Sequence, residues 1–290
     1  MLRLFIKKHP KLRKLAVSIL CFPKFIKYYI LYPLQGFVRE VFASCNKNFM
    51  KEIKSLKNSC YGKRCFIVAT GPSLTVADVN ALENANEITF GLNSIFKMFD
   101  KVTWRPDYYV CADLELMEEN INTYGKDFFE GKAKKMSFTD FVLKKEKFTG
   151  DVVYLPYNRC LHGMKTIFDD NFKFSLNPIY TFYDYYTVTA LAMLIAAYMG
   201  FKEIYLLGVD CNYMGKLRRA EGLEEKDDTR LSDDAFIYVA SQMQKGYAYL
   251  NKKLLKKGVT TYNATRGGAL EVFPRVNFDD VLGTKYGSNF

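Results

Sequence analysis

The sequence lacks the features that mark several protein classes. Its seven cysteines form an odd set with no Cys-x-x-Cys pair, which argues against a disulfide framework or a zinc site and favours reduced thiols in the cytoplasm. Neither the Gly-x-Gly-x-x-Gly dinucleotide pattern nor a Walker Gly-Lys-Ser/Thr is present, so NAD and P-loop chemistry are disfavoured. The uncharged stretch 15–23 is too short to cross about 30 Å of hydrocarbon. These absences leave a globular cytoplasmic protein without a spanning helix.

Acidic residues are scarce in the first 64 positions. This segment carries 15 Lys or Arg residues against only Glu40 and Glu52, whereas the rest of the chain is close to charge balance. A polybasic segment can bind nucleic acid or an anionic membrane. Here the basic residues are interleaved with apolar and aromatic ones, as in LFIKK and KFIKYYIL, which favours the headgroup boundary of a membrane over nucleic acid.

Residues 1–60 are therefore predicted to form basic amphipathic helices that hold the protein to the inner face of the plasma membrane. Pro10, Pro23 and Pro33 are expected to divide the first forty residues into short helical pieces. A polar helix is expected over 46–62. The alternative is a pair of helices that pack into the core while their lysines reach water.

Residues 61–290 are predicted to form one Rossmann-like α/β domain. Short apolar runs alternate with helical patterns, which indicates a mostly parallel sheet with helices on both faces and a binding crevice at the carboxyl ends of the strands. The expected strands are 65–69, 87–92, 108–112, 152–155, 203–208 and 259–263.

Two helices of this domain can be predicted individually. Residues 187–199 are apolar nearly all round, which predicts a buried helix that ends at Gly200. A second helix is expected to begin at Ser232 as N-cap and to end in lysines before Gly258. The charged segment 213–231 lies before it and is expected to be a mobile loop over the site.

A turn of small residues follows the first expected strand. In CFIVATGPSL, Thr70, Gly71, Pro72 and Ser73 come directly after the apolar run. Such a turn lets the backbone approach a ligand closely, and Ser73 can cap the next helix so that its N-terminus points at a phosphate. An ordinary strand-to-helix turn explains the pattern equally well.

Polar side chains also stand where three expected strands finish. Asn93 follows FGL, Asp113 follows YYVCA, and Asp210 follows IYLLGV. Each could simply cap a helix. Three together at the same edge of a parallel sheet favour a ligand site.

At these residues the chain resembles the family 42 sialyltransferases and their relatives in the MptE-like superfamily, which includes archaeal pterin diphosphokinases and motility-associated flagellin glycosyltransferases. The GPSL turn, Asn93, the helix start Thr187-Val188-Thr189 and the run AAYMGFKEIYLLGVD carry the resemblance. The segments TWRPDYYV and YNATRGGALEVFPRV resemble MptE-like proteins of surface-polysaccharide clusters. The similarity spans about residues 60–282.

The resemblance implies a metal-independent, inverting glycosyltransferase that uses a nucleotide sugar, with CMP as the expected nucleotide, as donor and needs no other cofactor. By position, Gly71, Pro72 and Ser73 would lie at the phosphate and ribose, Asn93 and Asp113 near the donor, Thr187, Val188 and Thr189 at the cytidine, and Tyr213 at the leaving phosphate. Two departures from the family pattern leave the identity of the donor and of the catalytic base undecided. Ala69 and Thr70 replace a Gly and an Asn of the sialyltransferase turn, and the histidine that acts as the family's catalytic base is missing.

The implied reaction is attack of an acceptor hydroxyl on the anomeric carbon, which needs a base near that hydroxyl. His162 is the histidine inside the proposed domain, and an imidazole is suited to this step at neutral pH. Asp210 is the alternative base, and His162 could instead be a structural loop residue. Lys216, Arg218 and Arg219 are expected to serve the leaving phosphate when the loop closes.

Two other functions remain open on the sequence. One is transfer of diphosphate from ATP to a pterin, which would require magnesium and an acidic cluster. The other is a membrane-bound scaffold that has lost activity, suggested by the missing histidine. For the transferase, the expected partners are a nucleotide sugar, a glycan or glycolipid acceptor and an anionic membrane surface, and a homo-oligomer is left open.

Overall fold

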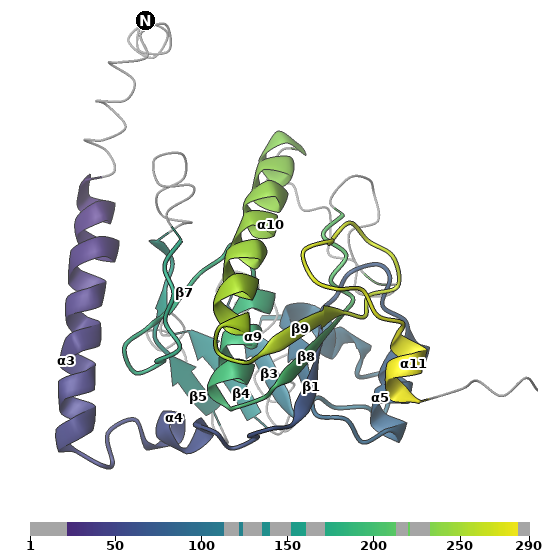
Figure 1. The fold of residues 1–290 in the computed structure, drawn as a ribbon, viewed down its shortest axis with the longest axis horizontal. Helices are drawn as coiled ribbons and strands as arrows, with labels where there is room; N and C mark the ends of the chain where they lie inside the picture. The colour runs from purple at the N-terminus through teal and green to yellow at the C-terminus, as the bar shows by residue number, and fades with distance from the viewer. Residues whose placement is uncertain are drawn as a thin grey trace, which may run out of the picture.

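The computed structural model describes residues 22–112, 122–123, 135–139, 152–160, 172–212, 220 and 233–283. Seven of its strands form one sheet in the order β5-β4-β3-β2-β1-β8-β9, and every neighbouring pair is parallel (Figure 1). The strands are β1 (Arg64–Val68), β2 (Thr89–Leu92), β3 (Tyr108–Cys111), β4 (Lys135–Thr139), β5 (Val152–Leu155), β8 (Glu203–Leu207) and β9 (Thr260–Asn263). A second, two-stranded sheet pairs β6 (Tyr157–Asn158) with β7 (Phe182–Tyr183).

The structure confirms the predicted α/β fold and all six expected strands. The sequence reading missed β4, whose residues KMSFT mix polar and apolar side chains and form no continuous apolar run. It also missed the two-residue strands β6 and β7, which are too short to show a period.

Both faces of the sheet are buried, because successive side chains of a strand point to opposite faces. In β1, Cys65 and Ile67 belong to one hydrophobic cluster, whereas Phe66 and Val68 belong to another. The first cluster contains α9 (Val188–Tyr198) and α10 (Asp233–Leu255). The second contains α5 (Val76–Asn84), the 3₁₀ segment η2 (Asn93–Met98) and α11 (Phe278–Leu282). Helices on both faces were predicted, and the structure confirms this.

The two predicted helices of the domain are present. Residues from Thr189 to Ala196 of α9 are all buried, and the chain turns at Gly200 with a φ of 90°, a left-handed conformation that glycine adopts without strain. Helix α10 has Lys252 and Lys253 in its last turn, near the negative end of the helix dipole. Its expected N-cap, Ser232, lies outside the described residues.

The amino-terminal helix differs from the prediction. Instead of short pieces separated by prolines, residues 22–45 form one continuous helix that passes through Pro23 and Pro33. Its middle is the π-helical segment η1 (Ile26–Leu31), and α3 (Tyr32–Cys45) follows with Pro33 in its first turn. Proline is tolerated in the first turn of a helix because it has no N–H to donate. The N–H of the preceding residue, Tyr32, donates to the carbonyl oxygen of Lys27, which is a π-helical bond.

The polar helix expected over 46–62 is also shorter than predicted. Only α4 (Lys51–Leu56) is helical, with turns on either side. Its Ile53 and Leu56 are buried in the main hydrophobic cluster. Within residues 1–60, α4 therefore packs into the core. Packing into the core was the alternative to membrane binding for this segment.

Candidate functional site at the carboxyl edge of the sheet

The strand order contains one switch point, between β1 and β8. From β1 the chain adds strands outward to β5 in one direction, and it then returns to place β8 and β9 on the other side of β1. In open parallel sheets a ligand crevice forms at the carboxyl ends of the strands where the order reverses. The turn that follows β1 and the residues that follow β8 therefore define the candidate site.

Gly71 is required in this turn by the neighbouring strand. Its N–H donates to the carbonyl oxygen of Gly208 over 2.9 Å. A Cβ at Gly71 would lie 2.0 Å from Oδ2 of Asp210 and 2.4 Å from the Gly208 oxygen. The space beside Gly71 is thus filled by the residues after β8. A ligand that approaches this backbone closely, as the sequence predicts, would have to do so from another side.

Ser73 does not cap the next helix, contrary to the prediction. Its hydroxyl donates to Oδ2 of Asp210 over 2.9 Å, so it ties the β1 turn to the end of β8. The N-cap of α5 is Thr75, which accepts from the N–H of Asp78, while the Asp78 carboxylate accepts from the N–H of Thr75. This reciprocal capping box satisfies the helix end two residues later than the sequence reading placed it.

Asp210 lies beneath the turn with only 7% of its surface exposed. Burial raises the pKa of its carboxyl group, and the hydrogen bonds from Ser73 oppose that rise. The segment after β9 covers it, since the N–H of Ala269 donates to the Asp210 carbonyl oxygen over 2.7 Å. Because Oδ2 of Asp210 accepts from Ser73, the carboxyl group holds the turn in position. The rise also brings the pKa of this carboxyl group closer to the pKa that suits a proton acceptor at neutral pH.

Asn93 follows β2, the strand that pairs with β1. It therefore lies at the same edge of the sheet as the Thr70–Ser73 turn, which follows β1. Asn93 has a left-handed φ of 46°, which is uncommon for a residue other than glycine. Its side-chain oxygen Oδ1 is buried and has no hydrogen-bond partner among the described residues. Buried polar oxygens are nearly always hydrogen-bonded, so this one points to a partner that the described residues do not supply.

The N-terminus of α9 lies at the same edge, because α9 packs on β1, β2 and β3 and returns the chain to the start of β8. Thr187 caps the helix by accepting from the N–H of Thr189, and its hydroxyl lies 3.2 Å from that of Tyr247 on α10. Val188 follows as the first helical residue. The preceding Tyr186 has a left-handed φ of 64°. The amides of a helix N-terminus favour an anion such as phosphate.

Several predicted site residues lie outside the described residues. These are Asp113, His162, Tyr213, Lys216, Arg218 and Arg219. Within the predicted loop 213–231, only Ala220 is described. Its N–H donates to the carbonyl oxygen of Thr70 over 3.0 Å, and its side chain is buried. The segment is therefore anchored on the candidate site at that residue.

Two arginines of YNATRGGALEVFPRV hold the edge together, although no role was predicted for them. Arg266 forms ion pairs with Asp78 of the capping box and with Asp279 of α11, and it lowers the pKa of Asp279. Arg275 donates to the carbonyl oxygens of Gly267 and Gly268. The motif that contains both arginines was the signal available in the sequence. It did not identify Asp78 as a partner of Arg266, because the two are 188 positions apart.

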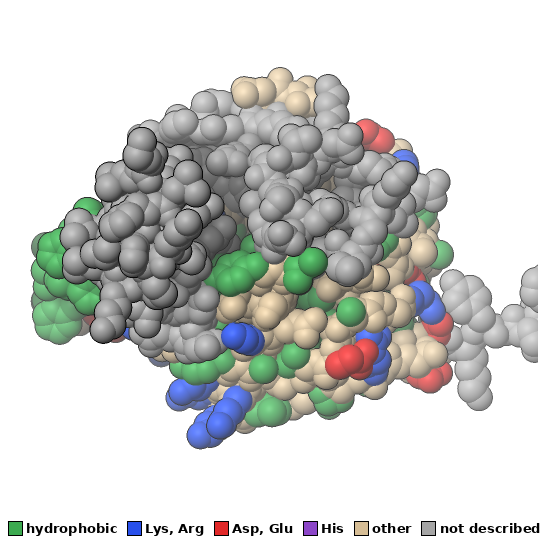
Figure 2. Space-filling model, turned by 90° about the horizontal axis from the view of Figure 1, so that it is seen from above, with side chains coloured by type: hydrophobic (Ala, Val, Ile, Leu, Met, Phe, Trp, Pro, Cys, Tyr) green, Lys and Arg blue, Asp and Glu red, His purple; other side chains and the backbone are tan. Residues whose placement is uncertain are grey.

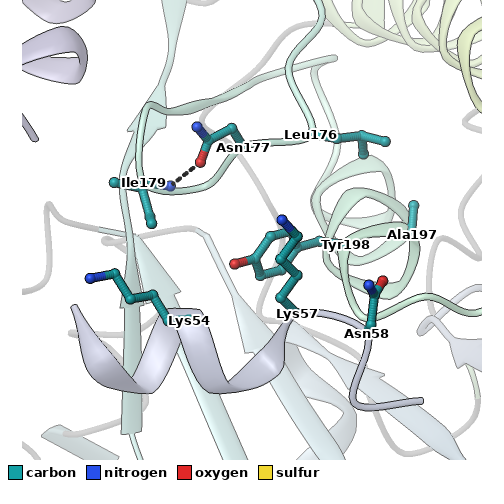
Figure 3. Close-up of a pocket in the computed structure, with 8 residues that line it drawn as sticks. All are labelled: Lys54, Lys57, Asn58, Leu176, Asn177, Ile179, Ala197 and Tyr198. Atoms are coloured by element: carbon teal, nitrogen blue, oxygen red, sulfur yellow. Dashed lines mark hydrogen bonds between the residues drawn. The ribbon is translucent and has the colours of Figure 1, made fainter. Parts of the chain in front are cut away.

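A pocket of about 480 Å³ lies elsewhere, between α4, residues 176–179 and the end of α9 (Figure 3). Ala197 and Tyr198 line it from the carboxyl end of α9, whereas the candidate site lies at the amino end of that helix. Lys54 and Lys57 give it a basic wall. Because it lies at the other end of α9, it is not part of the candidate site.

The described residues contain no group of three or more His, Cys, Asp or Glu side chains arranged to hold a metal ion. None of the described helices is long and apolar enough to cross a membrane.

The fold is that of a doubly wound α/β protein, and the candidate site lies at its switch point. Residues 40–216 match the family model described as MptE-like, 6-hydroxymethylpterin diphosphokinase MptE-like, and the chain belongs to this family. No curated protein sequence matches it significantly.

Two solved structures are similar in fold. One is the MAf glycosyltransferase from Magnetospirillum magneticum AMB-1, with 16% identity and a TM-score of 0.47 over 79% of this chain and 37% of that one. The chain thus spans little more than a third of that protein. The other is the sialyltransferase CstII from Campylobacter jejuni in complex with a substrate analogue, cytidine-5'-monophosphate, with 18% identity and a TM-score of 0.46 over 74% of this chain and 85% of that one.

Proposed function

We propose that this protein is a glycosyltransferase that binds a nucleotide sugar at the carboxyl edge of the sheet. The observation that carries the proposal is the buried Oδ1 of Asn93, which has no hydrogen-bond partner among the described residues and lies at the same sheet edge as the Thr70–Ser73 turn. That oxygen is suited to accept from a ribose hydroxyl or a base amino group, and the N-terminus of α9 is suited to the phosphate. The sequence resemblance at Thr187–Thr189 favours a CMP-linked donor.

In the proposed reaction an acceptor hydroxyl attacks the anomeric carbon of the donor. The new glycosidic bond forms as the bond between that carbon and the phosphate oxygen breaks, and the nucleotide monophosphate leaves with the electron pair. The hydroxyl proton passes to a base, for which His162 and Asp210 are the candidates. Lys216, Arg218, Arg219 and Tyr213 are proposed to stabilise the leaving phosphate.

The family description favours a second candidate function, transfer of diphosphate from ATP to a pterin. This reaction would use Mg²⁺ held by carboxylates. Asp210 is the described residue predicted to contribute, and its Oδ2 already accepts from Ser73.

Calorimetric titration with CMP, UDP and ATP, the last with Mg²⁺, tests the proposal. We expect CMP to bind at least tenfold more tightly than the other two, which corresponds to about 1.4 kcal/mol. Asn93→Ala should weaken CMP binding by about tenfold, because a buried hydrogen bond is lost. Asn86→Ala is the matched control, since Asn86 also has a left-handed φ, of 52°, but lies in the turn before β2, at the opposite edge of the sheet.

The other outcomes separate the alternatives. A tenfold preference for ATP would favour the diphosphokinase. No binding of any nucleotide would favour the scaffold. Equal CMP affinity of Asn93→Ala and Asn86→Ala would remove the nucleotide from this edge of the sheet.

A further inference from the structure

One face of the amino-terminal helix is apolar and exposed. Of the large hydrophobic side chains that are exposed in the described residues, most lie on this helix, and each of these has 45–60% of its surface exposed. They are Phe22, Ile30, Leu31, Leu34, Phe37, Val38, Val41 and Phe42. From Ile30 onward their spacing of three and four residues places them on one side of the helix. Figure 1 shows α3 at the edge of the molecule, and Figure 2 shows hydrophobic side chains gathered at that edge.

The charged side chains of α3 face the opposite way. Arg39 donates from Nε to the carbonyl oxygen of Ile179 over 2.9 Å and from a terminal nitrogen to that of Tyr180. The carboxylate of Glu40 accepts from the side-chain amide of Asn177. Surface helices of globular proteins usually bury their apolar face and expose their charges. Here the arrangement is inverted.

Close packing fixes this orientation. Gly36 is buried against Tyr180, where a Cβ would lie 2.6 Å from the ring. At the carboxyl end of α3, the ammonium group of Lys54 donates to the carbonyl oxygen of Ala43 over 2.7 Å. Rotating the helix to bury its apolar face would break the bonds of Arg39 and bring a larger side chain against Tyr180. The apolar face is therefore held outward by the body of the protein.

Basic residues flank the apolar face at both ends. Lys24 and Lys27 are exposed before it, and Lys47 and Lys51 are exposed after it. Between Tyr28 and Asn46 the only charged residues are Arg39 and Glu40, which face the body. None of the described helices is long and apolar enough to cross a membrane, and one side of this helix is bound to the body of the protein. The pattern is that of a helix lying in the plane of a membrane interface.

We propose that this face of residues 22–45 lies in the surface of an anionic lipid bilayer, with its apolar side chains below the headgroups and the flanking lysines among them. A second copy of the chain is a poorer occupant. Antiparallel packing of two such helices would bring Lys24 and Lys27 of one copy near Lys47 and Lys51 of the other, whereas lipid phosphates complement both ends. This proposal about the apolar face of residues 22–45 does not depend on the proposed glycosyltransferase reaction.

Sedimentation of the full-length chain with vesicles of 30% phosphatidylglycerol and 70% phosphatidylcholine tests the proposal. Leu34→Glu and Phe37→Glu should each weaken vesicle binding at least tenfold, because each places a charge in the buried face. Leu255→Glu is the matched control, since Leu255 is 50% exposed on α10 but lies outside the face. It should bind as the wild type does. The substituted side chains are exposed, so all three variants should melt as the wild type does.

Salt separates the apolar face from the basic residues. At 0.5 M NaCl surface charges are largely screened, and the wild type should retain part of its binding while both face variants lose theirs. Leu34→Ser and Phe37→Ser should give intermediate losses without adding charge, which keeps the test valid if a glutamate variant fails to fold.

Three results would overturn the proposal. Equal binding by Phe37→Glu, Leu34→Glu and Leu255→Glu would mean that charge alone attracts the protein. Absence of vesicle binding together with a dimer on light scattering, dissociated by Phe37→Glu, would assign the face to a second copy. A monomer that never sediments would mean that neither lipid nor a second copy covers it.

Discussion

Replacing Gly71 with alanine tests whether the turn after β1 is built against β8. The backbone of Gly71 is outside the left-handed region, so alanine can adopt it without conformational strain. The effect of the substitution is therefore steric. The new Cβ would meet Oδ2 of Asp210 at 2.0 Å and the carbonyl oxygen of Gly208 at 2.4 Å, and both must move.

The magnitude follows from those two contacts. Overpacking a fitted site costs about 1–3 kcal/mol. If Asp210 swings away it also loses the bond from Ser73, and a hydrogen bond to a charged group contributes about 1.5–3 kcal/mol. The two contributions together give an expected loss of about 2.5–6 kcal/mol, which lowers the Tm by roughly 5–12 °C for a chain of this size.

Thermal unfolding followed by circular dichroism measures this change, and CMP titration measures its effect on the site. Gly62→Ala is the control, because nothing lies within 4 Å of its Cβ position and only its φ of 79° opposes the substitution. That control should cost about 1–2 kcal/mol. Adding Asp210→Ala to Gly71→Ala should give less than the sum of the single effects, since it removes the shorter contact. A Gly71→Ala protein that melts within about 1 °C of the wild type, which is about the measurement error, would refute the reasoning.

Three further results are expected. Asp210→Asn should melt at or above the wild type at pH 7. Burial raises the pKa of the Asp210 carboxyl group, so its contribution to stability is fully present below the unfolded pKa and is lost as pH rises through the folded pKa. The difference in Tm between the two proteins should therefore vanish in acid, and a constant difference across pH would contradict the prediction. His162→Ala should lower kcat by at least about 100-fold with CMP affinity unchanged, and if Asp210→Asn does this instead, the base is the carboxylate. EDTA should leave turnover intact, whereas a loss reversed by Mg²⁺ would favour the diphosphokinase.

The strands that build the site could be predicted from the sequence. Apolar runs such as CFIV and IYLL are buried on both faces of a parallel sheet, so they show as continuous hydrophobic segments. The polar residues after them, Asn93 and Asp210, could be placed at strand ends for the same reason. Strand β4 was missed for a different reason. KMSFT alternates between polar and apolar residues, but it is short and has no continuous apolar run of the kind that marks the other strands.

The roles of the turn residues could not be predicted. Both Ser73 and Thr75 are suitable N-caps, and local sequence does not distinguish them. The choice depends on Asp210, which is 137 positions from Ser73 and accepts its hydroxyl, leaving Thr75 to pair with Asp78. In the same way, Arg266 is paired with Asp78 across 188 positions.

The sequence by itself determined the alternation of strands and helices, the parallel sheet and the concentration of basic residues in the first 64 positions, because each of these is written in the local period or composition. Only the tertiary structure decided which strand ends meet and which way α3 faces. From the sequence, the amino-terminal segment was predicted to form basic amphipathic helices at a membrane surface, with packing into the core as the alternative. The direction in which α3 faces depends on the contacts of Arg39 with Ile179 and Tyr180, about 140 residues away, which turn its charged side inward and leave its apolar side exposed. Contacts between such distant residues have no local signature.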